Sequence, residues 1–181
     1  MYAHHTNLIE AWGMRTSLAV GLALLGIWLL SGQTVSAQDK AHAELAKALR
    51  DAKVSLAKGL AASAQKGTPI SGKFELEEGK LQLSVYTMQG DTFSEVIVDH
   101  TTGKGGKVEP ITSGEDFTAA TAQRAAMTKA KKSLQAVVDA AVKAHAGSHA
   151  VSIFPALKGE QAVAEITLVK NGEFTTVSEP L

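Results

Sequence analysis

Two stretches of the sequence carry side chains that could do chemistry. The first is Asp99 to Lys107, with the sequence DHTTGKGGK, in which a carboxylate, an imidazole, two hydroxyls and two lysines lie among glycines. Glycines beside a lysine are typical of phosphate-binding loops. A P-loop, however, needs Gly-x-x-x-x-Gly-Lys followed by Ser or Thr, between a strand and a helix. Here Lys107 is followed by Val-Glu-Pro, which argues against a nucleotide site.

The same stretch is well suited to a tight turn at the end of a strand. An Asp such as Asp99 accepts hydrogen bonds from backbone amides just beyond it, and Thr102 can do so more weakly. Gly103 supplies the positive φ that a tight turn requires. The sequence therefore predicts a structural turn formed by these three residues.

The second stretch contains His145 and His149, which are four residues apart, as two metal ligands on one helical face would be. Gly147 lies between them and favours the end of a helix, and a histidine near a helix C-terminus is stabilising without any metal. No acidic third ligand is close in sequence. A structural role is the favoured interpretation, and a metal or small-ligand site at His145 and His149 is the alternative.

Other catalytic arrangements lack their sequence signals. The chain has no cysteine, which excludes disulfides, thiolate metal ligands and a cysteine nucleophile. No Gly-x-Ser-x-Gly elbow is present. We therefore expect a protein that is not an enzyme and needs no cofactor.

Charge and the N-terminal sequence indicate where the protein acts. Among 181 residues, 18 are Lys or Arg and 18 are Asp or Glu, so there is no basic excess to favour nucleic acid. Arg15, the apolar run 18–30 and the small residues ending at Ala37 have the pattern of a secretory signal peptide. We expect residues 1–37 to be that signal, with 1–13 an upstream-start extension, and the mature chain to be periplasmic or secreted without a membrane segment.

The remainder of the chain repeats one order of elements. Residues 39–65 have helical apolar spacing, and three runs of alternating polarity follow up to Val98, with KVEPI as a fourth short strand. Residues 115–146 are again helical, and three further alternating runs follow, the last two joined by the hairpin signal Asn171-Gly172. AKVSL at 52–56 also matches AKKSL at 130–134.

A helix followed by KFELEEGKLQLSVYTMQGDTFSEVIVDHTTGKGGKVEPI resembles a PepSY domain, a small module with a helix on an antiparallel sheet and a strand ending in Val-Asp-x-x-Thr-Gly. The resemblance covers residues 39–111. Residues 112–181 share the element order but end in VSEPL, so they are interpreted as a degenerate repeat. The predicted fold is α+β, with two tandem units that each pack a helix on a three- to four-stranded antiparallel sheet. The two sheets either stay separate or join edge to edge into one longer sheet.

The strands carry apolar side chains on both faces. If the helix covers Leu83 and Val85, then Tyr86, Met88 and Ile97 lie on the opposite face. An apolar face needs a cover, which the second repeat, a homodimer partner or another protein could provide. We take these three residues as the predicted partner-binding surface.

The resemblance implies a binding or regulatory role, because PepSY domains occur in propeptides of secreted metallopeptidases and in cell-envelope proteins and have been proposed to restrain peptidases. The sequence thus predicts an exported, non-catalytic module whose partner is an envelope protein, with a peptidase as one candidate. A periplasmic protein that binds a small ligand or a metal through His145 and His149 is the alternative.

Overall fold

A computed structural model describes residues 37–181, so the predicted signal peptide lies outside the described residues except for Ala37. The helices are α1 (Ala37–Ala48), α2 (Leu56–Ser63), α3 (Gly114–Lys129) and α4 (Leu134–Ala144), with 3-10 turns η1 (Leu49–Asp51) and η2 (Ala64–Lys66). The strands are β1 (Thr68–Glu77), β2 (Lys80–Gln89), β3 (Thr92–Val98), β4 (Gly105–Ile111), β5 (His149–Lys158), β6 (Gln161–Lys170) and β7 (Glu173–Pro180).

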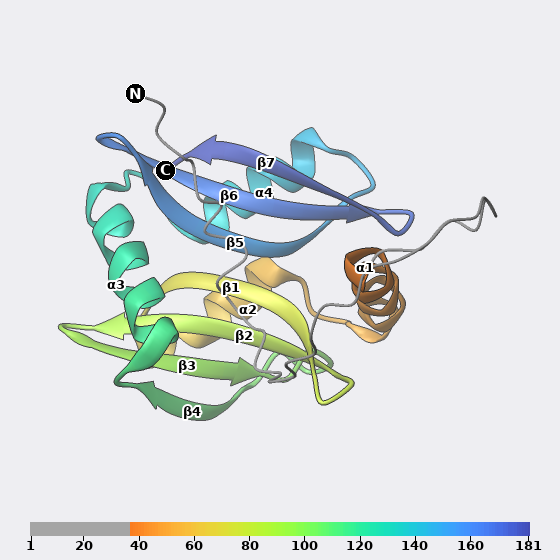
Figure 1. Cartoon of the computed structure of the whole chain (residues 1–181), viewed down its shortest axis with the longest axis horizontal. Coiled ribbons are helices and arrows are strands. Elements are labelled where there is room, and N and C mark those ends of the chain that lie inside the picture. The colour runs from red at the N-terminus through yellow and green to blue at the C-terminus, as the bar shows by residue number, and fades with distance from the viewer. Residues whose placement is uncertain (1–36) are drawn as a thin grey trace, which may run out of the picture.

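All these strands belong to one antiparallel sheet with the order β4-β3-β2-β1-β5-β6-β7. The predicted α+β class is confirmed. The structure does not show two separate helix-on-sheet units, because β1 pairs with β5 through Gly72↔Ile153 and Lys73↔Ser152. This junction makes the two predicted sheets continuous (Figure 1).

The helices lie on both faces of the sheet. In Figure 1, α2 and α4 lie behind the strands and α3 lies in front of them, whereas α1 lies at the right, beside the ends of the strands. The α2 and α4 helices contact each other and cover one core that extends behind both halves of the sheet. Its most deeply buried side chains include Leu56, Leu60, Leu83, Val138, Ile153 and Ile166.

A glycine in the central strand allows α2 to approach closely. A Cβ added at Gly72 would lie 3.2 Å from a methyl carbon of Leu60 and 3.3 Å from one of Leu56. Both leucines are at most 2% exposed. Gly72 therefore fits the place where helix and sheet are closest.

Each predicted long helix is interrupted, so the prediction of continuous helices over 39–65 and 115–146 is wrong. Ala52 and Ala130 adopt extended backbone, with ψ of 125° and 140°. Three residues after each, Ser55 and Ser133 cap the next helix by accepting hydrogen bonds from backbone N–H groups, at 3.3 Å and 3.2 Å. A serine N-cap favours a new helix start at these positions over continuation of the first helix.

The predicted turns and edge strand are present. Asn171 and Gly172 have φ of 54° and 87°, which are the positive values that a type I′ hairpin needs. KVEPI lies in β4 at one edge of the sheet, where Pro110 is tolerated because an edge strand leaves one side unpaired. No helix within residues 37–181 is long and apolar enough to span a membrane.

Candidate functional site

The stretch that begins at Asp99 forms a turn between β3 and β4. A carboxylate oxygen of Asp99 accepts hydrogen bonds from the backbone N–H groups of Thr101 and Thr102, both at 2.8 Å. These two bonds lower the pKa of the exposed Asp99 carboxyl. The N–H of Gly103 donates to the Asp99 carbonyl at 2.7 Å, and Gly103 has φ of +76°.

This turn also holds the break between η1 and α2. The carbonyl of His100 accepts hydrogen bonds from the backbone N–H groups of Lys53 and Val54, at 2.9 Å and 3.0 Å. A Cβ at Gly103 would lie 3.4 Å from Val54, which is buried. The turn thus joins two segments distant in sequence, and its geometry gives it a structural role.

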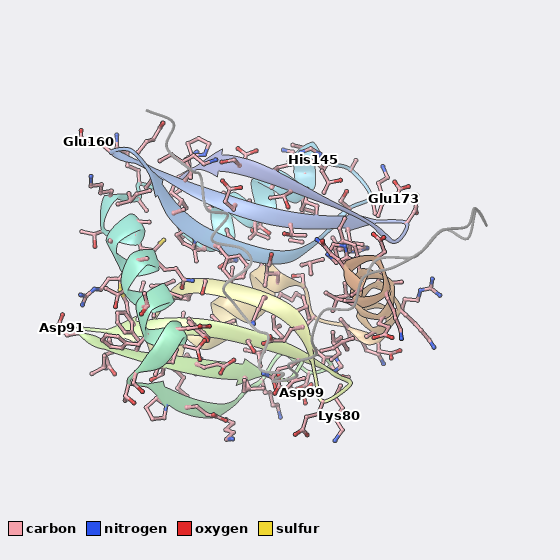
Figure 2. The ribbon with its side chains drawn as sticks, viewed as in Figure 1. Lys80, Asp91, Asp99, His145, Glu160 and Glu173 are labelled. Atoms are coloured by element: carbon pink, nitrogen blue, oxygen red, sulfur yellow. The ribbon has the colours of Figure 1, made fainter. Side chains whose placement is uncertain are left out.

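The histidines singled out from the sequence do not converge. His145 is the exposed C-cap of α4, which Gly147 follows at φ of +83°, and His149 is exposed at the start of β5. His145 and Asp99 lie well apart in Figure 2. Residues 37–181 contain no group of three or more His, Cys, Asp or Glu side chains arranged to hold a metal ion.

The predicted partner-binding surface is covered by the chain itself. Tyr86 is only 4% exposed and packs in a second core with Ile70, Phe93, Ile111 and Ala120. Ala120 belongs to α3, which lies across this face of the sheet (Figure 1). The second half of the chain therefore covers this apolar face. This was one of three possibilities, beside a homodimer partner and another protein.

Met88 and Ile97 on the same face are partly buried. Met88 packs against the core beneath α3, so it too lies largely under the helix. Since Tyr86 is enclosed and Met88 is partly enclosed, these positions do not provide an open contact surface. The prediction that this face is left for a partner is therefore corrected for Tyr86 and Met88.

Burial also controls ionisation beneath α3. It raises the pKa of the Tyr86 hydroxyl, and the nearby carboxylates of Glu95 and Asp116 raise it further. Burial likewise raises the pKa of Glu95, an effect that a hydrogen bond with Ser84 partly offsets. Tyr86 therefore stays neutral, which excludes it as a phenolate nucleophile.

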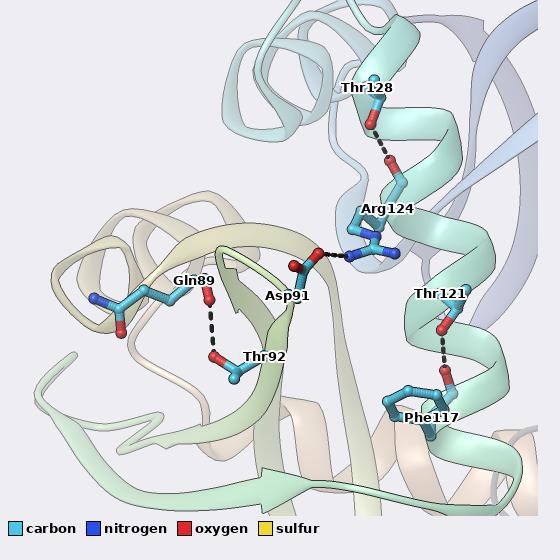
Figure 3. A network of polar contacts seen from close by, with 7 residues as sticks. All are labelled: Gln89, Asp91, Thr92, Phe117, Thr121, Arg124 and Thr128. Carbon is cyan, nitrogen blue, oxygen red and sulfur yellow. Dashed lines mark hydrogen bonds and ion pairs between the residues drawn. The ribbon is translucent and has the colours of Figure 1, made fainter.

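The α3 helix is anchored to the β2–β3 hairpin, and Figure 3 shows the Arg124–Asp91 pair that joins them. Arg124 donates to the Asp91 carboxylate at 2.7 Å, and its guanidinium lies 5.3 Å from the centre of the Phe93 ring. Phe117 packs edge-to-face against Phe93, with ring centres 5.6 Å apart. These contacts hold α3 over the strands, where it also contacts β1, β5 and β6 in the middle of the sheet.

A groove lies over that middle region, between α1 and α3. Its volume is about 830 Å³, within the range of about 300–1,000 Å³ that is typical of ligand sites. We call it the sheet groove. Its lining includes Leu45 of α1, Ala122 and Gln123 of α3, and Ser152, Phe154 and Phe174 of the sheet.

The charged side chains on the floor of the sheet groove form pairs within the protein. Lys73 forms an ion pair with Glu75, and Glu165 pairs with Lys158 at 2.6 Å. Both pairs join residues that face the same side of the sheet. The floor therefore presents little unpaired charge, and its recognition of a ligand depends on apolar contact and hydrogen bonding.

Aromatic rings form part of the groove. His42 of α1 stacks on Phe174 of β7, with ring centres 4.5 Å apart and an angle of 20° between planes. This contact joins α1 to the far half of the sheet. His42 thus lies at one end of the groove, where the arrangement supports packing.

Little in the sequence indicates this site. Leu45, Phe154 and Phe174 belong to three separate elements, and the groove forms where α1, α3 and the strands come together. The one usable signal was that apolar residues occur on both faces of the strands. Comparison of the chain with protein-family models, curated proteins and solved structures finds no match.

Proposed function

We propose that this chain is an exported, non-catalytic binding module that captures a protein partner of the cell envelope in the sheet groove. The observation that carries the proposal is the groove itself, an open and mainly apolar hollow over the centre of the sheet. Apolar hollows of this size are typical of ligand-binding or protein-interaction sites. The groove takes the place of the surface around Tyr86, Met88 and Ile97.

The PepSY resemblance of residues 39–111 supports a regulatory role for this binding, with a peptidase as one candidate partner. We further propose that residues 112–181 are a degenerate second copy of the same unit. Two features support a repeat: Ser55 and Ser133 cap equivalent helices, and β1 and β5 both have an irregularity near their starts, at Pro69/Ser71 and Ala150/Ser152. The signal-like sequence ending at Ala37 supports export.

Photo-crosslinking with a matched pair of positions on α3 tests the proposal. Ala122 and Ala125 are both exposed, but only Ala122 lines the groove. A photoreactive phenylalanine is placed at each position in the full chain, which is then expressed in cells with an outer envelope. We expect a covalent adduct with a discrete envelope protein from position 122 and none from position 125.

A second variant tests whether the groove surface drives that adduct. Phe154→Lys places a charge in the groove, whereas Val108→Lys makes a similar change at an exposed position on edge strand β4. We expect loss of the adduct only with Phe154→Lys. Equal adducts from positions 122 and 125, or an adduct that survives Phe154→Lys in a folded protein, contradict the proposal.

A further inference from the structure

We infer that the sheet groove takes an extended, uncharged peptide segment with apolar side chains, and that Gln123 recognises an N–H group of that segment. This inference rests on the proposed function, because it names the chemistry of the segment that the groove receives. Three observations support it: the unpartnered amide oxygen of Gln123, the internal pairing of the charges and the aromatic lining.

Gln123 has a buried acceptor without a partner. The residue is 6% exposed and lines the groove, yet its Oε1 accepts no hydrogen bond among the described residues. A buried acceptor left unsatisfied costs about 1–3 kcal/mol. The terminal torsion of a glutamine is soft, so its amide can turn towards a donor that enters the groove.

Glu115, at the start of α3, is a charged residue of the groove lining that is exposed to solvent. The charges on the strands that form the floor favour an uncharged ligand there. Lys73 and Glu165 each already pair with a side chain of opposite sign within the protein. A charged ligand group would have to break one of these pairs or lose water without compensation, which is unfavourable in a partly enclosed site. An uncharged segment leaves both pairs intact.

A peptide supplies both kinds of contact that the groove offers. Its backbone carries an N–H donor at every residue except proline, and its apolar side chains can pack against Phe154 and Phe174. A hydrocarbon ligand would fill the same space but leave Gln123 unsatisfied. The combination of aromatic floor and single buried acceptor therefore favours a peptide.

Isothermal titration calorimetry of the protein expressed from the full sequence tests this chemistry. The probe is an acetylated and amidated hexapeptide of valine, phenylalanine and threonine. We expect binding to the wild type, loss of binding with Phe154→Lys and retention with Val108→Lys. A matched hexapeptide with lysine at two valine positions should bind at least ten-fold more weakly.

Gln123→Leu isolates the hydrogen bond. It removes a buried acceptor that has no partner, so we expect the free energy of unfolding to be retained, while the hexapeptide binds about five-fold more weakly. Two probes N-methylated at alternate amides complete the test. One of these probes should bind the wild type about five-fold more weakly than the unmethylated hexapeptide does. The same probe should bind Gln123→Leu with the same affinity as the unmethylated hexapeptide.

The outcomes separate this inference from the proposed function. Unchanged hexapeptide affinity in Gln123→Leu overturns the role of Gln123, and stronger binding of the lysine peptide overturns the choice of an uncharged segment. Either result leaves an adduct from position 122 intact. Loss of that adduct overturns the proposed function itself, whatever the hexapeptide does.

Discussion

The two halves of the sheet begin alike but differ in how their first helix packs. In each half a helix is interrupted and a serine-capped helix follows it, α2 in the first half and α4 in the second. These capped helices lie side by side over one core. Of the preceding helices, α3 lies across the opposite face, whereas α1 lies beside the ends of the strands and also packs against the core of α2 and α4 (Figure 1).

The difference between α1 and α3 is one of burial. The α3 helix buries Ala120, Gln123 and Ala126, and Arg124 fixes it to the β2–β3 hairpin. No residue of α1 is fully buried, and α1 lies between the sheet groove and a second cavity of about 840 Å³. The comparison indicates that the groove has one firmly held wall and one loosely held wall.

The largest expected effect comes from the shared core behind the sheet. Leu83→Ala in the first half and Ile166→Ala in the second each remove a side chain that is 0% exposed. Each should lower the free energy of unfolding by about 2–5 kcal/mol. Because both residues belong to one core, urea unfolding followed by circular dichroism should show one transition that moves as a whole.

Independent halves would give a different result in that experiment. Two transitions, with only one displaced by each substitution, would mean that residues 37–111 and 112–181 fold separately. Lys131→Ala, on an exposed residue between α3 and α4, is the control and should leave the transition in place.

The helix caps give an intermediate effect and test the likeness of the halves. Ser55→Ala and Ser133→Ala each remove an oxygen that accepts a hydrogen bond from a backbone N–H near the helix start. Each should reduce the free energy of unfolding by about 1 kcal/mol. Ser→Asp at the same positions should retain most of the stability. A large effect at only one of the two serines would contradict the equivalence of α2 and α4.

A smaller effect is expected at the anchor of α3. Arg124→Ala removes the contact with Asp91 and the packing over Phe93. Because the Asp91 side chain is 99% exposed, the ion pair contributes little, and the total loss should be at most about 1 kcal/mol. Asp91→Ala should lower the free energy of unfolding by less than Arg124→Ala does. Equal decreases would indicate that the contact of Arg124 with the Phe93 ring adds no stability.

The smallest effect is expected only at acidic pH. It concerns the Asp99 turn between β3 and β4, which has no counterpart in the second half of the chain. Hydrogen bonds from Thr102 and Thr101 lower the pKa of Asp99 in the folded protein below its ordinary value of 3.8. The contribution of the Asp99 carboxylate to the free energy of unfolding is therefore fully present well above pH 3.8. It is lost as the pH falls through the pKa of Asp99 in the folded protein. Asp99→Asn should flatten the dependence of unfolding free energy on pH below about 4, and an unchanged acid dependence would contradict this role.

Local patterns predicted much of the sheet. The alternation around Leu83 and Val85 and the Asn171-Gly172 pair have direct physical consequences within a few residues, so strands and hairpin follow from them. The helix interruption at Ala52 did not follow, because the amides of Lys53 and Val54 bind the carbonyl of His100, some 46 residues further along by residue number. A tertiary contact of this kind leaves no local pattern.

The candidate site was less predictable than the sheet. The alternation placed Tyr86 opposite Leu83, as observed, but could not show that α3 would cover Tyr86. α3 comes from the second half of the chain and contacts β1 as well as β5 and β6. The groove between α1 and α3 depends on the junction of β1 and β5, which two residue pairs define.

The most direct test of the central claim is to map where the uncharged hexapeptide binds, using backbone amide chemical shifts. The account predicts that the largest changes on titration lie in α1, in the groove-facing residues of α3 and in the middle of β1, β5 and β6. Val108 and its neighbours in β4 should not shift. Changes concentrated in edge strand β4, or on α2 and α4 behind the sheet, would contradict binding in the sheet groove.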